Sequence, residues 1–320
     1  MNICILLATY NGQEYLNQQL DSLINQTETS WQCLIRDDGS TDDTINIIKN
    51  YCAKDTRFTL VVDEQGPQGN AMANFAKLMH EGLTTEADFF FFCDQDDVWL
   101  NNKVEIMHNE LKKHNNNHPF LVHHDLEVVD ENLAQINPSF IKYSKLDSSA
   151  SFARLLGRNT VTGCASACNR KLFEMSLPMP AEAMMHDWWL ALSASYVGEL
   201  YFLNTVLGKY RQHSNNVLGA KPFKIKINLF NMSRKSFHKN LKTFHTTILQ
   251  ARAFLVLINE NKQAENDNFI TLETYSKILS LSKFSRIKAA INLGFFQKYW
   301  LAKLVSFAKF SIYSSKYHDV

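Results

Sequence analysis

Three carboxylates follow a single apolar run of the sequence within four residues. Asp94, Asp96 and Asp97 come directly after residues 89–93, a run of aromatic side chains typical of a strand covered on both faces. Acidic groups this close together repel one another unless a cation neutralises them. A hard divalent ion is the simplest solution, because Mg²⁺ and Mn²⁺ prefer oxygen ligands and keep open positions for substrate phosphates. The competing interpretation is an acidic helix cap, since residues 100–114 have a helical pattern.

Two other apolar runs are also followed by polar residues. Thr9, Asn11 and Glu14 come after residues 3–8, and the segment 37–42, Asp-Asp-Gly-Ser-Thr-Asp, comes after residues 31–35. In open parallel sheets, ligands bind beyond the carboxyl ends of the strands. These side chains are therefore expected to meet at one pocket.

Two phosphate-binding motifs are absent, which limits how this pocket could hold phosphate. The sequence has no Walker loop and no G-x-G-x-x-G after a strand, which argues against a P-loop nucleotide hydrolase and a Rossmann dehydrogenase. A metal ion with basic side chains is the remaining route. Lys103 and Arg211 are candidates to hold phosphate, and His213 is a candidate for phosphate or for the metal.

The elements that must position these residues alternate between short apolar strands and amphipathic helices. This order predicts an α/β fold with a largely parallel sheet. The expected strands are 3–8, 31–35, 58–62, 89–93, 120–123 and 200–210, and the expected helices include one with an apolar face from residue 16 to 24, one capped by Asp42, and one over 71–83.

The last hundred residues differ from the rest in charge and composition. Residues 1–220 have a net charge of −11, whereas residues 221–320 have +12, few glycines and apolar residues at helical spacing over 248–258 and 295–310. We expect a domain over 1–220 and a basic helical appendage over 221–320. A basic tail suits an anionic membrane surface or nucleic acid, and solvated helix faces are the competing interpretation.

Composition places the chain among ordered globular proteins. The hydrophobic fraction is 45% and the charged fraction 20%, and no uncharged apolar stretch reaches the roughly 20 residues of a membrane span. The amino-terminal apolar run lacks the basic residues and cleavage site of a secretion signal. Six scattered cysteines read as buried thiols. We expect a cytoplasmic protein, soluble or peripheral to a membrane.

Four ordered motifs resemble those of family 2 glycosyltransferases of the GT-A fold. They are A-T-Y-N-G at 8–12, D-D-G-S-T-D at 37–42, D-x-D-D at 94–97 and H-D-W-W at 186–189. The resemblance covers about residues 1–220, and the run 210–220 is similar to the bacterial rhamnosyltransferase branch. It implies a GT-A fold with a mainly parallel central sheet, a nucleotide-diphosphate sugar donor and Mg²⁺ or Mn²⁺.

The family pattern implies roles for individual residues. Thr9, Asn11 and Glu14 would line the nucleotide pocket, and Asp38 would contact the base, with Asp37 as its neighbour. Asp94 and Asp96 would correspond to the ribose-phosphate and metal motif. We assign Asp94 with Lys103 and Arg211 to the nucleotide sugar, and Asp96, Asp97 and His213 to the metal.

The same pattern implies that Asp187 is the catalytic base. Many relatives have a Glu before this Asp, where this chain has His186, so any role of that carboxylate is lost here. In an inverting transfer, the acceptor hydroxyl attacks opposite the leaving diphosphate, and one base takes its proton. A helix cap is the structural alternative for Asp187.

The expected function is therefore inverting, metal-dependent transfer of a sugar, with rhamnose favoured, from dTDP-rhamnose or a UDP-sugar. The acceptor would be a saccharide or lipid-linked saccharide of a bacterial surface polysaccharide. The protein would contact the anionic inner face of the cytoplasmic membrane and bind no nucleic acid. Two alternatives remain: a non-catalytic sugar-binding or scaffold protein, and a sugar-nucleotide pyrophosphorylase.

Overall fold

Contacts within the computed structural model divide the chain into two compact units. The structure describes residues 2–62, 66–114, 116–214, 234–260, 266–298 and 310–311. The first unit comprises Met1–Leu146, Val161–Met179 and Met185–Pro222, and the second Asp147–Thr160, Pro180–Met184 and Phe223–Val320. The second unit thus takes two short segments from earlier in the sequence. The boundary at residue 220 stays a prediction.

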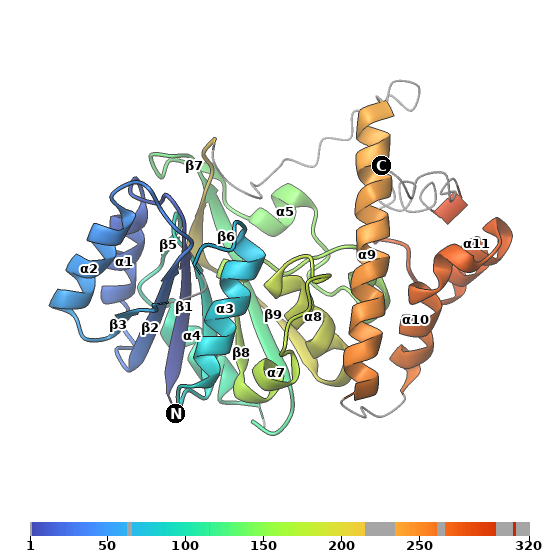
Figure 1. Ribbon diagram of the computed structural model, residues 1–320, viewed down its shortest axis with the longest axis horizontal. Coiled ribbons are helices and arrows are strands. Elements are labelled where there is room, and N and C mark those ends of the chain that lie inside the picture. The colour runs from blue at the N-terminus through green and yellow to red at the C-terminus, as the bar shows by residue number, and fades with distance from the viewer. Residues whose placement is uncertain are drawn as a thin grey trace. The chain divides into compact units, whose positions relative to one another are not determined.

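The first unit is built on one mixed sheet (Figure 1). Its strands run in the order β3-β2-β1-β4-β8-β6-β9-β5, with β7 paired to β6. Strands β3, β2, β1 and β4 are parallel, as expected, and β8 is antiparallel to its two neighbours. Their bounds are β1 (Ile3–Thr9), β2 (Trp31–Asp37), β3 (Phe58–Leu60), β4 (Phe89–Asp94), β5 (Val98–Trp99), β6 (Phe120–Val129), β7 (Gln135–Asn137), β8 (Ser166–Asn169) and β9 (Glu199–Arg211).

The register of the parallel strands brings the polar segments together. β1 lies between β2 and β4, with Thr9 opposite Asp37 and Ala8 opposite Asp94. The carboxyl ends of the three strands therefore finish at one edge of the sheet. This register, which depends on pairing between distant segments, turns three separate motifs into neighbours.

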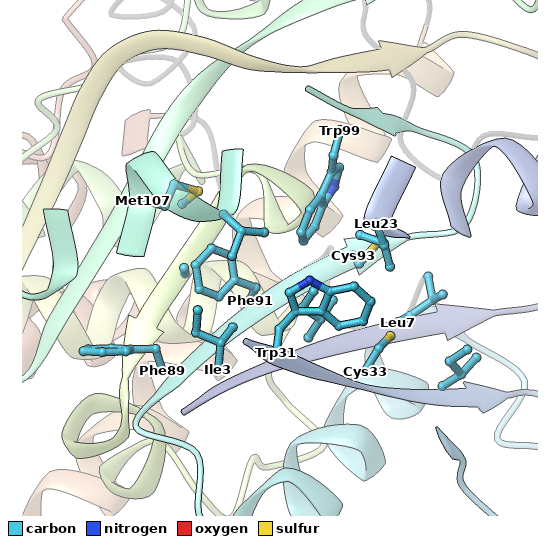
Figure 2. Close-up of a cluster of buried hydrophobic side chains, with 14 of the residues drawn as sticks. Ile3, Leu7, Leu23, Trp31, Cys33, Phe89, Phe91, Cys93, Trp99 and Met107 are labelled. Carbon is cyan, nitrogen blue, oxygen red and sulfur yellow. The ribbon is translucent and has the colours of Figure 1, made fainter. Parts of the chain in front are cut away.

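Alternate residues of the central strands enter two different cores. Odd-numbered residues such as Ile5 and Phe91 pack in one cluster, and even-numbered residues such as Leu6 and Phe92 pack in the other. Figure 2 shows the first cluster, in which Trp31 and Phe91 lie among side chains from several strands. Burial on both faces explains why the run 89–93 is continuously apolar rather than alternating.

Helices of the first unit cover both faces of the sheet. Helix α3 has the bounds that the sequence predicted, 71–83. Helix α4 is shorter than the expected 100–114. Asp42 does not cap the next helix as expected: Asp43 occupies the N-cap position, and the Asp42 carboxylate accepts hydrogen bonds from the amide and hydroxyl of Thr44. The helices are α1 (Leu16–Ile24), α2 (Thr44–Lys54), α3 (Ala71–Leu83), α4 (Lys103–Leu111), α5 (Phe140–Ser144), η1 (Gly163–Ala165), α7 (Arg170–Met175) and α8 (His186–Val197).

The described part of the second unit is helical. It contains α6 (Phe152–Gly157), α9 (Arg234–Glu260), α10 (Asp267–Ser276), η2 (Ile278–Ser280) and α11 (Lys283–Asn292). Its core is aromatic: Tyr275 packs edge-to-face on Phe295, and its hydroxyl lies 2.9 Å from Thr247 Oγ1. Most of the expected helix over 295–310 lies outside the described residues. Within the described part of the chain, no helix has the length and apolarity to cross a bilayer.

The junction between α8 and β9 is tightly packed at Gly198. Gly198 packs so closely on Pro119 that a Cβ there would lie 2.1 Å from the Pro119 carbonyl oxygen, which also accepts the Glu199 amide at 2.9 Å. Gly198→Ala should therefore lower the free energy of unfolding by about 1–3 kcal/mol. Chemical denaturation measures the change.

A second glycine offers the matched control. At Gly157, at the end of α6, a Cβ would meet its nearest neighbours at ordinary contact distances of 3.5 and 3.7 Å. Gly157→Ala should leave stability unchanged or slightly raise it. Equal effects of the two substitutions would show that the contact with Pro119 does not constrain this junction.

Candidate functional site

The turn after β2 is closed by Asp37. Its carboxylate accepts hydrogen bonds from the amides of Gly39, at 3.0 Å, and Ser40, at 2.7 Å. It also accepts the Thr9 hydroxyl at 2.9 Å, which ties the ends of β1 and β2 together. Gly39 has a φ of +86°, a conformation that glycine adopts at little cost. Asp37 therefore shapes the turn, and its carboxylate oxygens are engaged in hydrogen bonds there.

Asn11 and Glu14, predicted to line the nucleotide pocket, lie beside it. The Asn11 amide donates to Ser40 Oγ at 2.7 Å, and its side-chain oxygen accepts the Thr41 amide at 2.8 Å. Asn11 thus joins the first and second loops. Glu14 is exposed. Neither residue lines either of the two cavities of the site, so a direct nucleotide contact by Asn11 or Glu14 stays a prediction.

Asp38 holds a loop that forms a wall of the site. It is 5% exposed, and its two oxygens accept the backbone amides of Gln68, at 2.6 Å, and Gly69, at 2.8 Å. Arg36 adds a 3.1 Å ion pair to Asp38 and a hydrogen bond to the Gly66 carbonyl at 3.0 Å. Asp38 does line the main cavity, but its oxygens are engaged by this loop. The predicted contact with a nucleobase remains untested.

The three loops and this wall enclose a cavity of about 560 Å³, within the size range of small-molecule sites. Two of the predicted residues that line it, Thr9 and Asp94, come from adjacent strands. Asp96, which comes just after the end of β4, also lines it. The full lining is Ala8, Thr9, Tyr10, Asp38, Gly39, Pro67, Gly69, Asn70, Ala71, Asn74, Phe75, Asp94, Gln95 and Asp96.

A smaller cavity of about 120 Å³ adjoins the first. The two share Ala71, Phe75, Asp94 and Asp96. The smaller one is also lined by Asp187, at the start of α8. Asp187 therefore faces a common space with Asp94 and Asp96, although it follows them by more than 90 residues in the sequence.

The acidic side chains of this space perturb one another. Burial raises the pKa of Asp94 to about 7, with repulsion from Asp96 and Asp187 adding to the effect. Burial likewise raises the pKa of Asp97, which is 2% exposed and lies beside the Cys164 thiol. Asp97 lines neither cavity. Asp94, Asp96 and Asp187 therefore repel one another at the wall of the shared space.

Of the predicted metal ligands, Asp96 and His213 are brought together. His213 Nε2 lies 2.7 Å from Asp96 Oδ2, and the imidazole packs on the Tyr15 ring at 4.9 Å. Asp97 instead points inward, where its carboxylate accepts the backbone amide of Arg211 at 3.1 Å. The sequence motif alone does not separate these two carboxylates.

The two predicted phosphate ligands are turned away from both cavities. The Arg211 guanidinium donates to the Asp96 carbonyl at 2.8 Å and lies over the Tyr15 ring at 4.4 Å. Lys103 is fully buried, donates to the Cys164 carbonyl and lies 3.6 Å from the centre of the Trp99 ring. Neither lines a cavity, so these contacts do not support phosphate binding by either residue.

Asp187 is fixed at the first turn of α8. Its Oδ2 accepts the Gly163 amide at 2.9 Å, and its Oδ1 accepts the amide of Trp188 at 2.6 Å. The preceding His186 packs on Phe75 with ring centres 3.8 Å apart, and burial lowers its pKa to about 3, so that it is neutral near pH 7. His186 therefore contributes no charge to the space that Asp187 faces.

Some residues of the site had no motif to mark them. Gly163 belongs to none of the four motifs, yet its amide holds Asp187, and a Cβ there would lie 2.6 Å from His186 Nε2. Gln95 lies inside the acidic motif, where it pairs with the backbone of Tyr10 at 2.8 and 2.9 Å. Asn74 faces the cavity from α3, whose apolar pattern was the only signal in that segment.

Comparison with known proteins supports the fold and the family. The sequence model of glycosyl transferase family 2 matches residues 4–176, more than half of the chain. The crystal structure of S. aureus TarS in complex with UDP-GlcNAc superposes with a TM-score of 0.56 at 12% identity, covering 91% of this chain and 73% of that one. The fold is therefore the GT-A fold that the motifs implied.

Two curated relatives cover most of their own length in the match. dTDP-rhamnosyl transferase RfbG of Shigella flexneri is 27% identical over 246 residues, which cover 73% of this chain and 81% of that protein. The UDP-Glc:alpha-D-GlcNAc-diphosphoundecaprenol beta-1,3-glucosyltransferase WfgD of Escherichia coli is 24% identical over 227 residues, covering 68% and 80%. Against four Rickettsia glycosyltransferases, the match covers 34% to 64% of their length.

The family match spans β1, β2 and β4 together with the loops that enclose the larger cavity. The likeness in fold extends over most of the remaining chain. The chain therefore belongs to glycosyl transferase family 2, and it is a glycosyltransferase.

Proposed function

We propose that this glycosyltransferase acts with inversion and moves a sugar, with rhamnose as the first candidate, onto a hydroxyl of a saccharide or lipid-linked saccharide in bacterial surface polysaccharide synthesis. The observation that carries this proposal is the pair of adjoining cavities that share Asp94 and Asp96, with Asp187 lining the smaller one. The larger cavity suits the donor nucleotide. The smaller one suits the reacting sugar and the acceptor hydroxyl.

The donor is inferred to be dTDP-rhamnose or a UDP-sugar. Among the relatives, RfbG is named for dTDP-rhamnose and WfgD for UDP-Glc, at identities of 27% and 24%. Both donors join a pyrimidine nucleoside to a sugar through a diphosphate. The common chemistry that the larger cavity must accept is therefore a nucleoside diphosphate.

Asp187 is proposed as the base that takes the acceptor proton. A general base must reach the proton that it abstracts, and Asp187 lines the smaller cavity from α8, whereas Asp94 and Asp96 line it from the end of β4. Hydrogen bonds from the amides of Gly163 and Trp188 fix the direction of the Asp187 carboxylate. A single base with a single displacement leads to inversion at the anomeric carbon.

A divalent cation fits the acidic cluster. Burial raises the pKa of Asp94, and repulsion from Asp96 and Asp187 adds to the shift; a bound Mg²⁺ or Mn²⁺ would relieve that repulsion. Asp94, Asp97 and Cys164 lie close enough together to ligate an ion, but a thiol suits neither metal and Asp97 is sealed from the cavities. We therefore favour Asp96 with His213, and Asp94 beside them. When bound, the cation would stabilise charge on the leaving diphosphate.

The protein is inferred to work in the cytoplasm, peripherally at the inner face of the bacterial membrane. The acceptor named for WfgD carries a diphosphoundecaprenol lipid, and residues 221–320 of this chain have a net charge of +12. Basic segments are attracted to anionic leaflets. Nucleic acid is not the proposed partner.

The donor and metal assignments are tested together by screening donor hydrolysis across purified nucleotide sugars. Turnover of dTDP-rhamnose or of one UDP-sugar is expected with Mg²⁺ or Mn²⁺, and it should stop when EDTA removes the metal. Asp96→Asn should reduce turnover by about 10²-fold or more, because one ligand and its charge are lost. Asp43→Asn, which removes an exposed carboxylate near the start of α2, is the control. Binding of donors without any turnover would favour the non-catalytic alternative.

The base assignment is tested by Asp187→Asn. The amide keeps the size of the side chain but cannot accept the proton, so kcat should fall by about 10²- to 10⁴-fold. The donor dissociation constant, measured by calorimetry, should stay near that of the wild type. Near-wild-type transfer by the folded variant, or a product that retains the donor's anomeric configuration, would refute the mechanism.

Lys103 is proposed to position Asp187 rather than to bind phosphate. It donates to the Cys164 carbonyl in η1, and the neighbouring residue of the same turn, Gly163, donates its amide to Asp187 at 2.9 Å. One short turn thus links the buried ammonium to the proposed base. Burial lowers the pKa of Lys103 to about 8, while attraction from nearby acidic groups, Asp97 among them, opposes that shift.

The two roles of Lys103 predict different kinetics for Lys103→Met. Loss of positioning should lower kcat about 10- to 100-fold with little change in donor affinity, since small displacements of a reacting group are costly. Loss of a phosphate ligand would instead weaken donor binding. Lys112→Met, at the exposed end of α4, should change neither quantity. A weakened donor affinity with unchanged kcat at saturation would contradict the positioning role.

A further inference from the structure

Helix α11 in the second unit carries an exposed apolar face. Phe284 is 79% exposed and Ile291 is 62% exposed, and Lys288 lies between them at helical spacing. Residues at positions i, i+4 and i+7 share one side of an α-helix. An aromatic ring of this exposure is unusual in a protein whose other described aromatic side chains are mostly buried.

The opposite face of α11 fixes the helix in place. Ala290 is fully buried, and Arg286 is 8% exposed. The Arg286 guanidinium donates to the carbonyls of Leu281, at 2.9 Å, and Leu279, at 2.6 Å. Ser282 caps the first turn by accepting the Ser285 amide at 3.2 Å. Anchoring of this kind determines which side chains point outward.

Helix α11 lies in a basic stretch of the sequence. Residues 274–318 contain eight Lys and Arg and no Asp or Glu. Elsewhere in this unit, Lys277 pairs with Glu273 and Lys298 with Asp147. Among the described residues, no such ion pair involves Lys283 or Lys288 of α11. Two exposed cations therefore flank the apolar side chains without a neutralising partner.

We propose that α11 docks on an anionic lipid bilayer. Phe284 and Ile291 enter the headgroup region, and Lys283 and Lys288 contact lipid phosphates. A helix that combines large apolar side chains with lysines on its outer side has the chemistry of an interfacial membrane helix. The inference rests on the proposed function for its purpose, which is to bring the enzyme to a lipid-linked acceptor.

A bilayer suits this face better than a second copy of the chain. Protein interfaces have cores that are depleted in lysine, whereas Lys288 lies between the two apolar side chains here. An identical α11 would also bring the same positive charges together. Anionic lipid offers a partner of opposite charge and a medium into which single apolar side chains can enter.

Vesicle sedimentation of the full chain tests this proposal. Wild-type protein is expected to bind vesicles of phosphatidylcholine mixed with phosphatidylglycerol, and to bind vesicles of phosphatidylcholine alone much less. The double variant Lys283→Gln, Lys288→Gln should weaken binding to the anionic vesicles about 25-fold, at about fivefold for each lysine near such a surface. Phe284→Ser with Ile291→Ser should weaken it on the order of tenfold.

Exposed residues of the first unit provide matched controls. Lys113→Gln, in the turn after α4, and Ile136→Ser on β7 should bind vesicles as the wild type does. Wild-type binding by the α11 variants, or equal binding of the wild type to both vesicle types, would overturn the proposal. So would a change from dimer to monomer in the apolar variant, which would identify the face as a contact between copies.

A separate measurement distinguishes failure of this inference from failure of the proposed function. Donor hydrolysis in the absence of vesicles should be the same in the α11 variants and the wild type, because none of these side chains lines the candidate site. Loss of vesicle binding with intact hydrolysis supports membrane docking by α11. The protein could instead bind vesicles through α11 and hydrolyse no donor. That result would support the docking surface and would count against the enzyme mechanism alone.

Discussion

The crowding of carboxylates at the end of β4, where Asp97 is buried, is the constraint on which the first unit depends. Charged groups are costly to bury unless they are paired or hydrogen-bonded, and Asp97 is nearly inaccessible to water. The compensation comes from distant segments: α4 supplies the Lys103 ammonium, and β9 supplies the Arg211 amide. Burial of Asp97 therefore depends on α4 and β9 packing around the end of β4.

The same arrangement divides the labour between the acidic residues. The carboxylates of Asp37 and Asp38 accept hydrogen bonds from backbone amides. These bonds shape two loops of the larger cavity. Asp94 and Asp96 face the open space, and Asp97 faces the interior. Residues with identical chemistry thus differ in role because their backbone positions direct them to different partners. The unfavourable repulsion left at Asp94 is concentrated where a cation and a diphosphate are proposed to bind.

His186, at the position where the family resemblance implies an acidic residue, is accommodated by its surroundings. The imidazole lies against Phe75 and Phe92 and is kept neutral by burial. Only glycine fits at position 163, because His186 occupies the space of a side chain there. The amide of Gly163 can then reach Asp187. The histidine thereby preserves the environment of the neighbouring carboxylate without adding a second negative charge to it.

The sequence by itself determined the alternation of strands and helices, the family, and the clustering of polar residues after three strands. These features depend on local periodicity and on short motifs, and α3 was predicted to the residue. The sequence also left Lys103 and Arg211 as equal candidates for phosphate, because both are basic and lie near the motifs. Only the tertiary structure turned them inward, where the Lys103 ammonium attracts Asp97 and the backbone amide of Arg211 donates to it. It likewise revealed Gly163 as the partner of Asp187, because a backbone amide leaves no mark on the sequence until the chain has folded around it.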